Sequence, residues 1–126
     1  MAVKLNSKGF DHAKELVKQR KVVVDERDDW SEHQPSTEQE NEFIQEHGFA
    51  AYGAWHLGVD SDRQEDTKGH YKFPYGDFRK VHRCAVIAAE SRAGQYKYQD
   101  IEMAAAHLHG MIETLSTRAP HEQRRR

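Results

Sequence analysis

The sequence predicts a single small α+β domain. Three observations indicate this class: a helical apolar period near the start, two alternating apolar runs in the middle, and an apolar helical stripe toward the end. A length of 126 residues fits one domain and can bury an apolar core without a disulfide or a metal ion. We expect about four helices and a short antiparallel sheet over residues 1–115, then a disordered basic tail over residues 116–126.

The first two helices are predicted from their apolar faces and their ends. A helix over residues 7–20 is capped by Ser7 and is followed by a β-branched run at 21–25 that suits a strand. A second helix starts at Ser36, where Gln39 completes a capping box. Gly48 is expected to end this helix, because glycine readily adopts the left-handed conformation after a helix.

Alternation of apolar residues predicts an antiparallel hairpin in the middle of the chain. One run contains Trp55, Leu57 and Val59, and a polar loop separates it from a second run, HYKFPY at 70–75. Pro74 donates no main-chain hydrogen bond, so the second strand is at an edge or is ending there.

Two helices are predicted in the last third. Asp77 suits the cap of a helix over 78–93, and a second helix over about 100–115 follows a short connection, which favours an antiparallel pair. The second helix has the clearest apolar stripe in the chain, formed by Ile101, Ala105, Leu108, Ile112 and Leu115.

Composition limits the classes of function. The net charge of −2 argues against a general nucleic-acid coat protein, and Cys84, the single cysteine, excludes an intrachain disulfide. The start of the chain lacks the apolar run of a signal peptide, and no stretch approaches a membrane span. We expect a cytoplasmic protein without a membrane partner.

No recognisable metal or cofactor motif is present. Nine histidines occur, but His107 and His109 would point to opposite faces of a helix, and the chain has no H-E-x-x-H motif or cysteine pair. His82 and Cys84, two residues apart on the predicted helix, would also diverge, so Cys84 is interpreted as a buried structural thiol. We expect neither a metal ion nor another cofactor.

Aromatic residues give the main functional indication, because tyrosine and tryptophan often anchor interfaces. The alternative, that they complete the core, stays open at this level. The favoured function is a non-enzymatic binding or assembly protein that contacts another protein through an aromatic and charged surface. The candidate binding residues are Trp55, His56, Tyr75, His82 and Arg83.

Two alternative functions are retained. The first is a small hydrolase or metal-dependent enzyme whose site gathers His56, His70, Asp77 and His82 around the hairpin. The second is nucleic-acid binding through residues 67–98, which hold seven basic residues against two acidic ones.

Two resemblances add to this interpretation. The runs DDWSEHQPS, YGAWHLGVD and KFPYGDFRKVHRCAVIAAESRAGQY resemble a family of small uncharacterised bacterial proteins over most of residues 3–115, a family that implies no activity. KFPYGDF and the alanine-rich helix after it, residues 71–95, resemble a segment of tailed-phage proteins, including regions attached to prohead proteases. No protease catalytic residue is carried over, and the resemblance implies a phage-related binding module.

Overall fold

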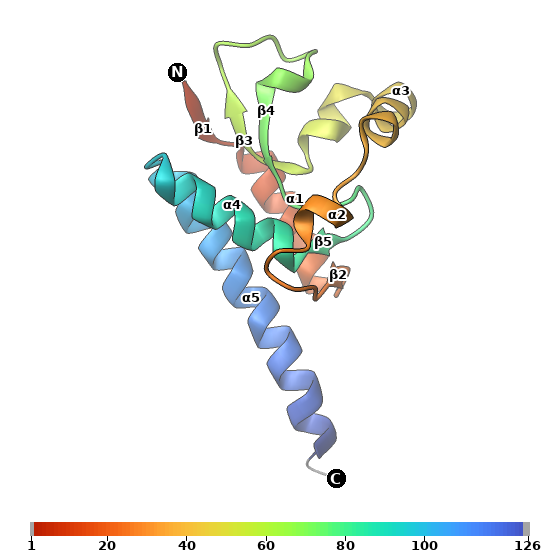
Figure 1. Cartoon of the computed structure of the whole chain (residues 1–126), viewed down its shortest axis with the longest axis vertical. Coiled ribbons are helices and arrows are strands. Elements are labelled where there is room, and N and C mark those ends of the chain that lie inside the picture. The colour runs from red at the N-terminus through yellow and green to blue at the C-terminus, as the bar shows by residue number, and fades with distance from the viewer. Residues whose placement is uncertain (1, 125–126) are drawn as a thin grey trace.

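The computed structural model describes the backbone of residues 2–124 and the side chains of residues 2–115. Within this part of the chain, five α-helices accompany a three-stranded and a two-stranded sheet, so the predicted α+β class is confirmed (Figure 1). The elements in chain order are β1 (Val3–Leu5), α1 (Ser7–Lys18), β2 (Val22–Val23), α2 (Trp30–His33), α3 (Thr37–Gly53), β3 (His56–Asp60), a 3₁₀ turn (Lys68–His70), β4 (Tyr71–Pro74), β5 (Val81–His82), α4 (Arg83–Gln95) and α5 (Gln99–Arg124).

The larger sheet contains the predicted hairpin. Its strand order is β1-β3-β4, and both pairings are antiparallel, with Gly58 opposite Lys72 in the hairpin. The short strand β1 was missed by sequence reasoning, because three residues are too few to show a period.

Helix α1 packs on this sheet by an unusually close approach. A Cβ added at Gly9 would lie 1.9 Å from the main-chain oxygen of His56, so a glycine is required in the first turn of α1. The N-cap of α1 is Asn6 and not the predicted Ser7. The Asn6 side chain instead donates to the carbonyl oxygens of Gly53 and His56, which ties α1 to the start of β3.

Helix α3 confirms the capping box and corrects the predicted helix end. The Ser36 hydroxyl accepts from the Gln39 amide at 3.1 Å, and the Gln39 side chain accepts from the Ser36 amide at 2.8 Å. Gly48 leaves the helical conformation, with φ of 87°, but the chain then resumes a helix through Gly53. Residues 49–53 therefore form a further helical turn after the kink at Gly48, and this turn buries Tyr52.

The helix pair at the end of the chain carries most of the core. Helices α4 and α5 lie side by side, joined by residues 96–98 (Figure 1). The predicted stripe is confirmed, since Ile101, Ala105, Leu108 and Ile112 are fully buried. The backbone of α5 continues to Arg124, whereas the side chains of residues 116–126 lie outside the described part, and the disorder expected there stays a prediction.

The start of α4 differs from the prediction. The helix begins at Arg83, and residues 76–82 form a turn and the two-residue strand β5. Phe78 in this turn has a φ of 73°, and β5 pairs in parallel with β2, placing Val22 opposite Val81. The distant β2 segment thus holds residues 81–82 extended, although their apolar spacing also suits a helix.

Among the described residues, no helix is both long and apolar enough to cross a membrane.

Candidate functional site

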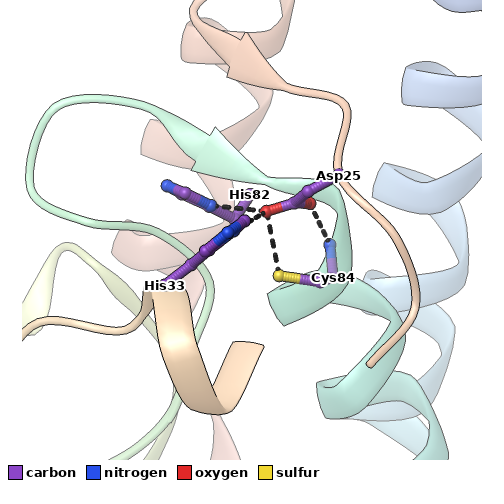
Figure 2. Close-up of side chains that lie close together, drawn as sticks. All are labelled: Asp25, His33, His82 and Cys84. Atoms are coloured by element: carbon purple, nitrogen blue, oxygen red, sulfur yellow. Dashed lines mark hydrogen bonds and ion pairs between the residues drawn. The ribbon is translucent and has the colours of Figure 1, made fainter. Parts of the chain in front are cut away.

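Three side chains, those of His33, His82 and Cys84, meet around the carboxylate of Asp25 (Figure 2). Its Oδ2 atom accepts from His33 Nδ1 at 2.8 Å, from His82 Nδ1 at 2.7 Å and from Cys84 Sγ at 3.0 Å. Its Oδ1 atom accepts from the main-chain amide of Cys84 at 2.8 Å. We call Asp25, His33, His82 and Cys84 the Asp25 cluster.

The pairing of β2 with β5 builds this cluster. The register places Val23 opposite His82, so the residues that follow, Asp25 and Cys84, run on beside each other. His82 is extended, with φ of −104° and ψ of 125°, and in extended backbone residues two apart point to the same side. His82 and Cys84 therefore face Asp25 together, which corrects the expectation that they diverge on a helix.

Burial and hydrogen bonding set the charges of the cluster. Burial acts to raise the pKa of Asp25, but hydrogen bonds from Cys84, His33 and His82 outweigh it and hold that pKa well below its usual range. Burial, aided by the Asp25 carboxylate, raises the pKa of the Cys84 thiol, so Cys84 is a protonated donor at neutral pH and not an activated nucleophile. The hydrogen bond to Asp25 raises the pKa of His33.

A second carboxylate, Asp77, holds the far side of His82. Its Oδ2 accepts from His82 Nε2 at 2.8 Å, and its Oδ1 accepts from the amides of Arg79 and Lys80. Burial acts to raise the pKa of Asp77, but these hydrogen bonds, that from His82 foremost, lower it. The prediction that Asp77 caps a helix over 78–93 is wrong: Asp77 closes the turn before β5, and the N-cap of α4 is His82.

The five predicted binding residues do not form one exposed patch. Trp55 and Tyr75 are 6% and 0% exposed and stack on each other in the core, and His82 belongs to the Asp25 cluster. Burial lowers the pKa of His56 to about 4, and its Nδ1 hydrogen-bonds the carbonyl oxygen of Tyr52. Arg83 borders the cluster: it donates to the carbonyl oxygen of Asp25 and pairs with Glu113.

The four residues of the enzyme alternative fall into separate groups. Asp77 and His82 are in contact, but His56 and His70 hydrogen-bond main-chain carbonyl oxygens elsewhere and lie against the ring of Tyr71. The hairpin therefore does not gather these four side chains into the predicted site.

A groove of about 620 Å³ lies next to the Asp25 cluster, a volume typical of ligand sites. Small alanines of α4 line it together with aromatic and proline side chains from α2, β4 and the connection between α4 and α5. These aromatic and proline residues are Trp30, Phe73, Pro74, Tyr96 and Tyr98. The Trp30 ring also lies 5.6 Å from the ring of His82, so α2 contributes to both the groove and the cluster.

Phe73 is held in the groove wall in a strained conformation. Its φ of 61° is rare for a residue with a bulky side chain and costs on the order of 1–3 kcal/mol. The ring packs edge-on against Tyr98, and it passes so close to Gly58 that a Cβ there would lie 3.0 Å away. Such strain is concentrated at functional sites more often than elsewhere.

The groove lining also carries unpaired positive charge. Arg27, Lys72 and Arg92 line it with Asp28, and none of the three cations has an ion-pair partner among the residues the structure describes. Two other basic residues of segment 67–98 are neutralised within the chain, since Lys68 pairs with Glu40 and Arg83 pairs with Glu113.

No protein-family model, curated protein or solved structure matches this chain. The resemblances to a bacterial family and to a phage segment therefore stay expectations, and function is inferred from the side chains described above.

Sequence reasoning missed both the Asp25 cluster and the groove. Asp25 and His33 lie in a polar run, DERDDWSEHQP, that contains no recognisable site motif, and the groove residues come from four distant segments. Two local signals were available: a valine run that ends in an aspartate, VVVD, and an H-x-C motif, and each suits a strand that ends at a polar site.

Proposed function

We propose that the protein is a non-enzymatic binding protein whose groove takes an acidic segment of a partner protein that also carries an apolar side chain. The observation that carries this proposal is a groove that combines an aromatic wall with three cations, none of which has an ion-pair partner in the described part of the chain. Acidic side chains of the partner complement Arg27, Lys72 and Arg92, and its apolar side chain packs over the alanines of α4. Aromatic and arginine residues are those that contribute most at protein interfaces.

Two observations favour binding over catalysis. The Cys84 thiol donates a hydrogen bond to Asp25, and its pKa is raised, whereas a nucleophilic cysteine has a lowered pKa. The histidines of the enzyme alternative also do not share a site, since His56 and His70 hydrogen-bond main-chain carbonyl oxygens apart from the Asp77–His82 pair.

A random peptide library panned on the immobilised protein tests the proposal. Selected peptides should combine acidic and apolar residues, and they should bind Arg92→Glu at least about 10-fold more weakly than the original protein, a difference of roughly 1.4 kcal/mol. Arg79→Glu is the matched control, because Arg79 is exposed and lies outside the groove, and it should bind nearly as well as the original.

The outcomes separate the alternatives. Peptides that bind Arg92→Glu and the original protein equally would contradict the groove as the site. A parallel titration with a single-stranded oligonucleotide addresses the nucleic-acid alternative: tight binding that falls steeply with added salt, together with no acidic peptide preference, would replace the protein partner by nucleic acid.

A further inference from the structure

We propose that the Asp25 cluster is a binding site for a transition-metal ion, with zinc as the ion that its donor atoms fit best. Asp25, His33, His82 and Cys84 each offer one ligand atom, and these four atoms all lie within 4.8 Å of one another. Ligands of tetrahedral zinc at bond lengths of about 2.0–2.3 Å are separated by roughly 3.3–3.8 Å. Small side-chain movements would therefore place an ion among them.

The hydrogen bonds within the cluster indicate what such an ion would replace. Three donors, from His33, His82 and Cys84, converge on the single oxygen Oδ2 of Asp25. A carboxylate oxygen has about two lone-pair sites, so three donors exceed its capacity. A divalent cation bound by Oδ2, the two Nδ1 atoms and Sγ resolves this crowding, because all four atoms then face positive charge.

The surroundings of the cluster resemble those of a metal site. The far nitrogen of His82 donates to Asp77, which is the carboxylate–histidine–metal arrangement that fixes the ring of a ligating histidine. The Cys84 amide holds Oδ1 of Asp25, leaving Oδ2 as the ligand atom. Asp25, His82 and Cys84 are buried, and the His33 side chain is 38% exposed, so an ion would enter past His33.

The donor set decides the type of ion and its role. One thiolate, two imidazoles and one carboxylate suit zinc rather than calcium or magnesium, which prefer oxygen ligands. Four protein ligands fill a tetrahedral shell and leave no open position, so the site is structural rather than catalytic. Binding must displace the Cys84 proton and the protons on Nδ1 of His33 and His82, so affinity should fall as the pH is lowered.

This site lies beyond the proposed groove but would act on it. Helix α2 has only four residues, and it carries both Trp30 of the groove wall and His33 of the cluster. An ion that joins His33 to Cys84 of α4 would fasten α2 against α4 and fix one wall of the groove. The proposal departs from the expectation of no metal, which depended on the absence of a recognisable ligand spacing in the sequence.

Calorimetric titration of the chelator-treated protein with Zn²⁺ tests the site directly. We expect one ion per chain with a Kd below about 1 μM. Asp77→Asn should weaken binding by about 10–100-fold, since it removes the support behind His82, and His33→Ala should weaken it by more than about 100-fold. His109→Ala is the matched control, because His109 is also a partly exposed histidine paired with a carboxylate, Glu90, and it should bind as the original does.

Cobalt provides a second readout that does not depend on a stability change. Co²⁺ bound by the cluster should show tetrahedral d–d absorption and a sulfur-to-cobalt charge-transfer band, and Cys84→Ser should lose that band. Absence of saturable one-to-one binding by the original protein would overturn the proposal. So would a cobalt spectrum without a sulfur band, or equal zinc affinities of His33→Ala and His109→Ala.

Discussion

Replacing Asp25 with asparagine should destabilise the fold more than any exposed acidic substitution. The carboxylate accepts four hydrogen bonds while its side chain is only 4% exposed. Asparagine can keep one acceptor oxygen for the Cys84 amide, but its NH₂ group then faces the donors of His33, His82 and Cys84. Donors would meet a donor in a site that has little access to water.

The magnitude follows from two estimates. Hydrogen bonds to a charged group contribute about 1.5–3 kcal/mol each, but four such values are not additive. Removing one partner of a buried ion pair costs about 3–5 kcal/mol, and we adopt this range for Asp25→Asn. Since domains of this size are stable by about 5–15 kcal/mol, the variant should keep its fold with a much smaller margin.

Urea denaturation at pH 7, with a chelator present so that no bound ion contributes, measures this loss. The midpoint should fall by at least about 1 M while the slope stays unchanged. Asp28→Asn is the control, because Asp28 is exposed and should change the free energy of unfolding by less than about 0.5 kcal/mol. A loss for Asp25→Asn below about 1 kcal/mol would refute the view that the carboxylate organises the cluster.

The stability difference between the original protein and Asp25→Asn should depend on pH in a defined direction. The folded pKa of Asp25 is held below its unfolded value, so its stabilisation is present above that unfolded value, about pH 4, and is lost as the pH falls through the folded pKa. The difference between the original and Asp25→Asn should therefore persist from pH 7 to about 5 and shrink only in stronger acid. A gap that closes already near pH 6 would contradict this account.

Three further perturbations have defined outcomes. Gly9→Ala should reduce the free energy of unfolding by about 1–3 kcal/mol or more and so lower the melting temperature, because the added Cβ would collide with the carbonyl oxygen of His56. An unchanged melting temperature would contradict the close packing of α1 on β3. Tyr75→Phe should reduce the free energy of unfolding measured in urea by about 1–2 kcal/mol, because the buried hydroxyl donates to the carbonyl oxygen of Ala54. Weaker partner binding at unchanged stability would instead support the interface role predicted from the sequence. Asp25 raises the folded pKa of His33, so the stabilisation that His33 contributes should be present below about pH 6.5 and be lost as the pH rises through that folded pKa. Thermal melts of the original protein and of His33→Gln over a range of pH measure this contribution. A stability difference between the two proteins that widens as the pH rises would contradict it.

Local patterns predicted the elements that local forces stabilise. The Ser36–Gln39 capping box and the stripe through Ile101 and Ile112 are decided by residues within one or two helical turns of each other. The hairpin was also predictable from the two alternating runs. The structure does not show one buried face in each strand, since burial is nearly continuous in β3 and intermediate throughout β4.

The site depended on contacts that no local pattern contains. Val81 fits the apolar row of a helix, but pairing with Val22 holds it extended and moves the start of α4 to Arg83. Tyr75 follows the last residue of β4, Pro74, yet it is fully buried and stacks on Trp55. Non-local pairing overrode helix propensity at the one joint where the Asp25 cluster forms.

The pairing of β2 with β5 has a consequence for the order of folding. The hydrogen bonds that Asp25 accepts from His82 and Cys84 span 57 and 59 positions of the chain, whereas α4 and α5 meet across a connection of three residues. Closing a loop of that length costs roughly 4 kcal/mol in chain entropy before any of these contacts can form. We therefore expect the helix pair to form early and the contacts of Asp25 to form after the rate-limiting step. Substitutions at Asp25 should then mainly accelerate unfolding and leave the refolding rate almost unchanged. In the cell, the half-life of the folded protein would depend on the part of the chain that assembles last.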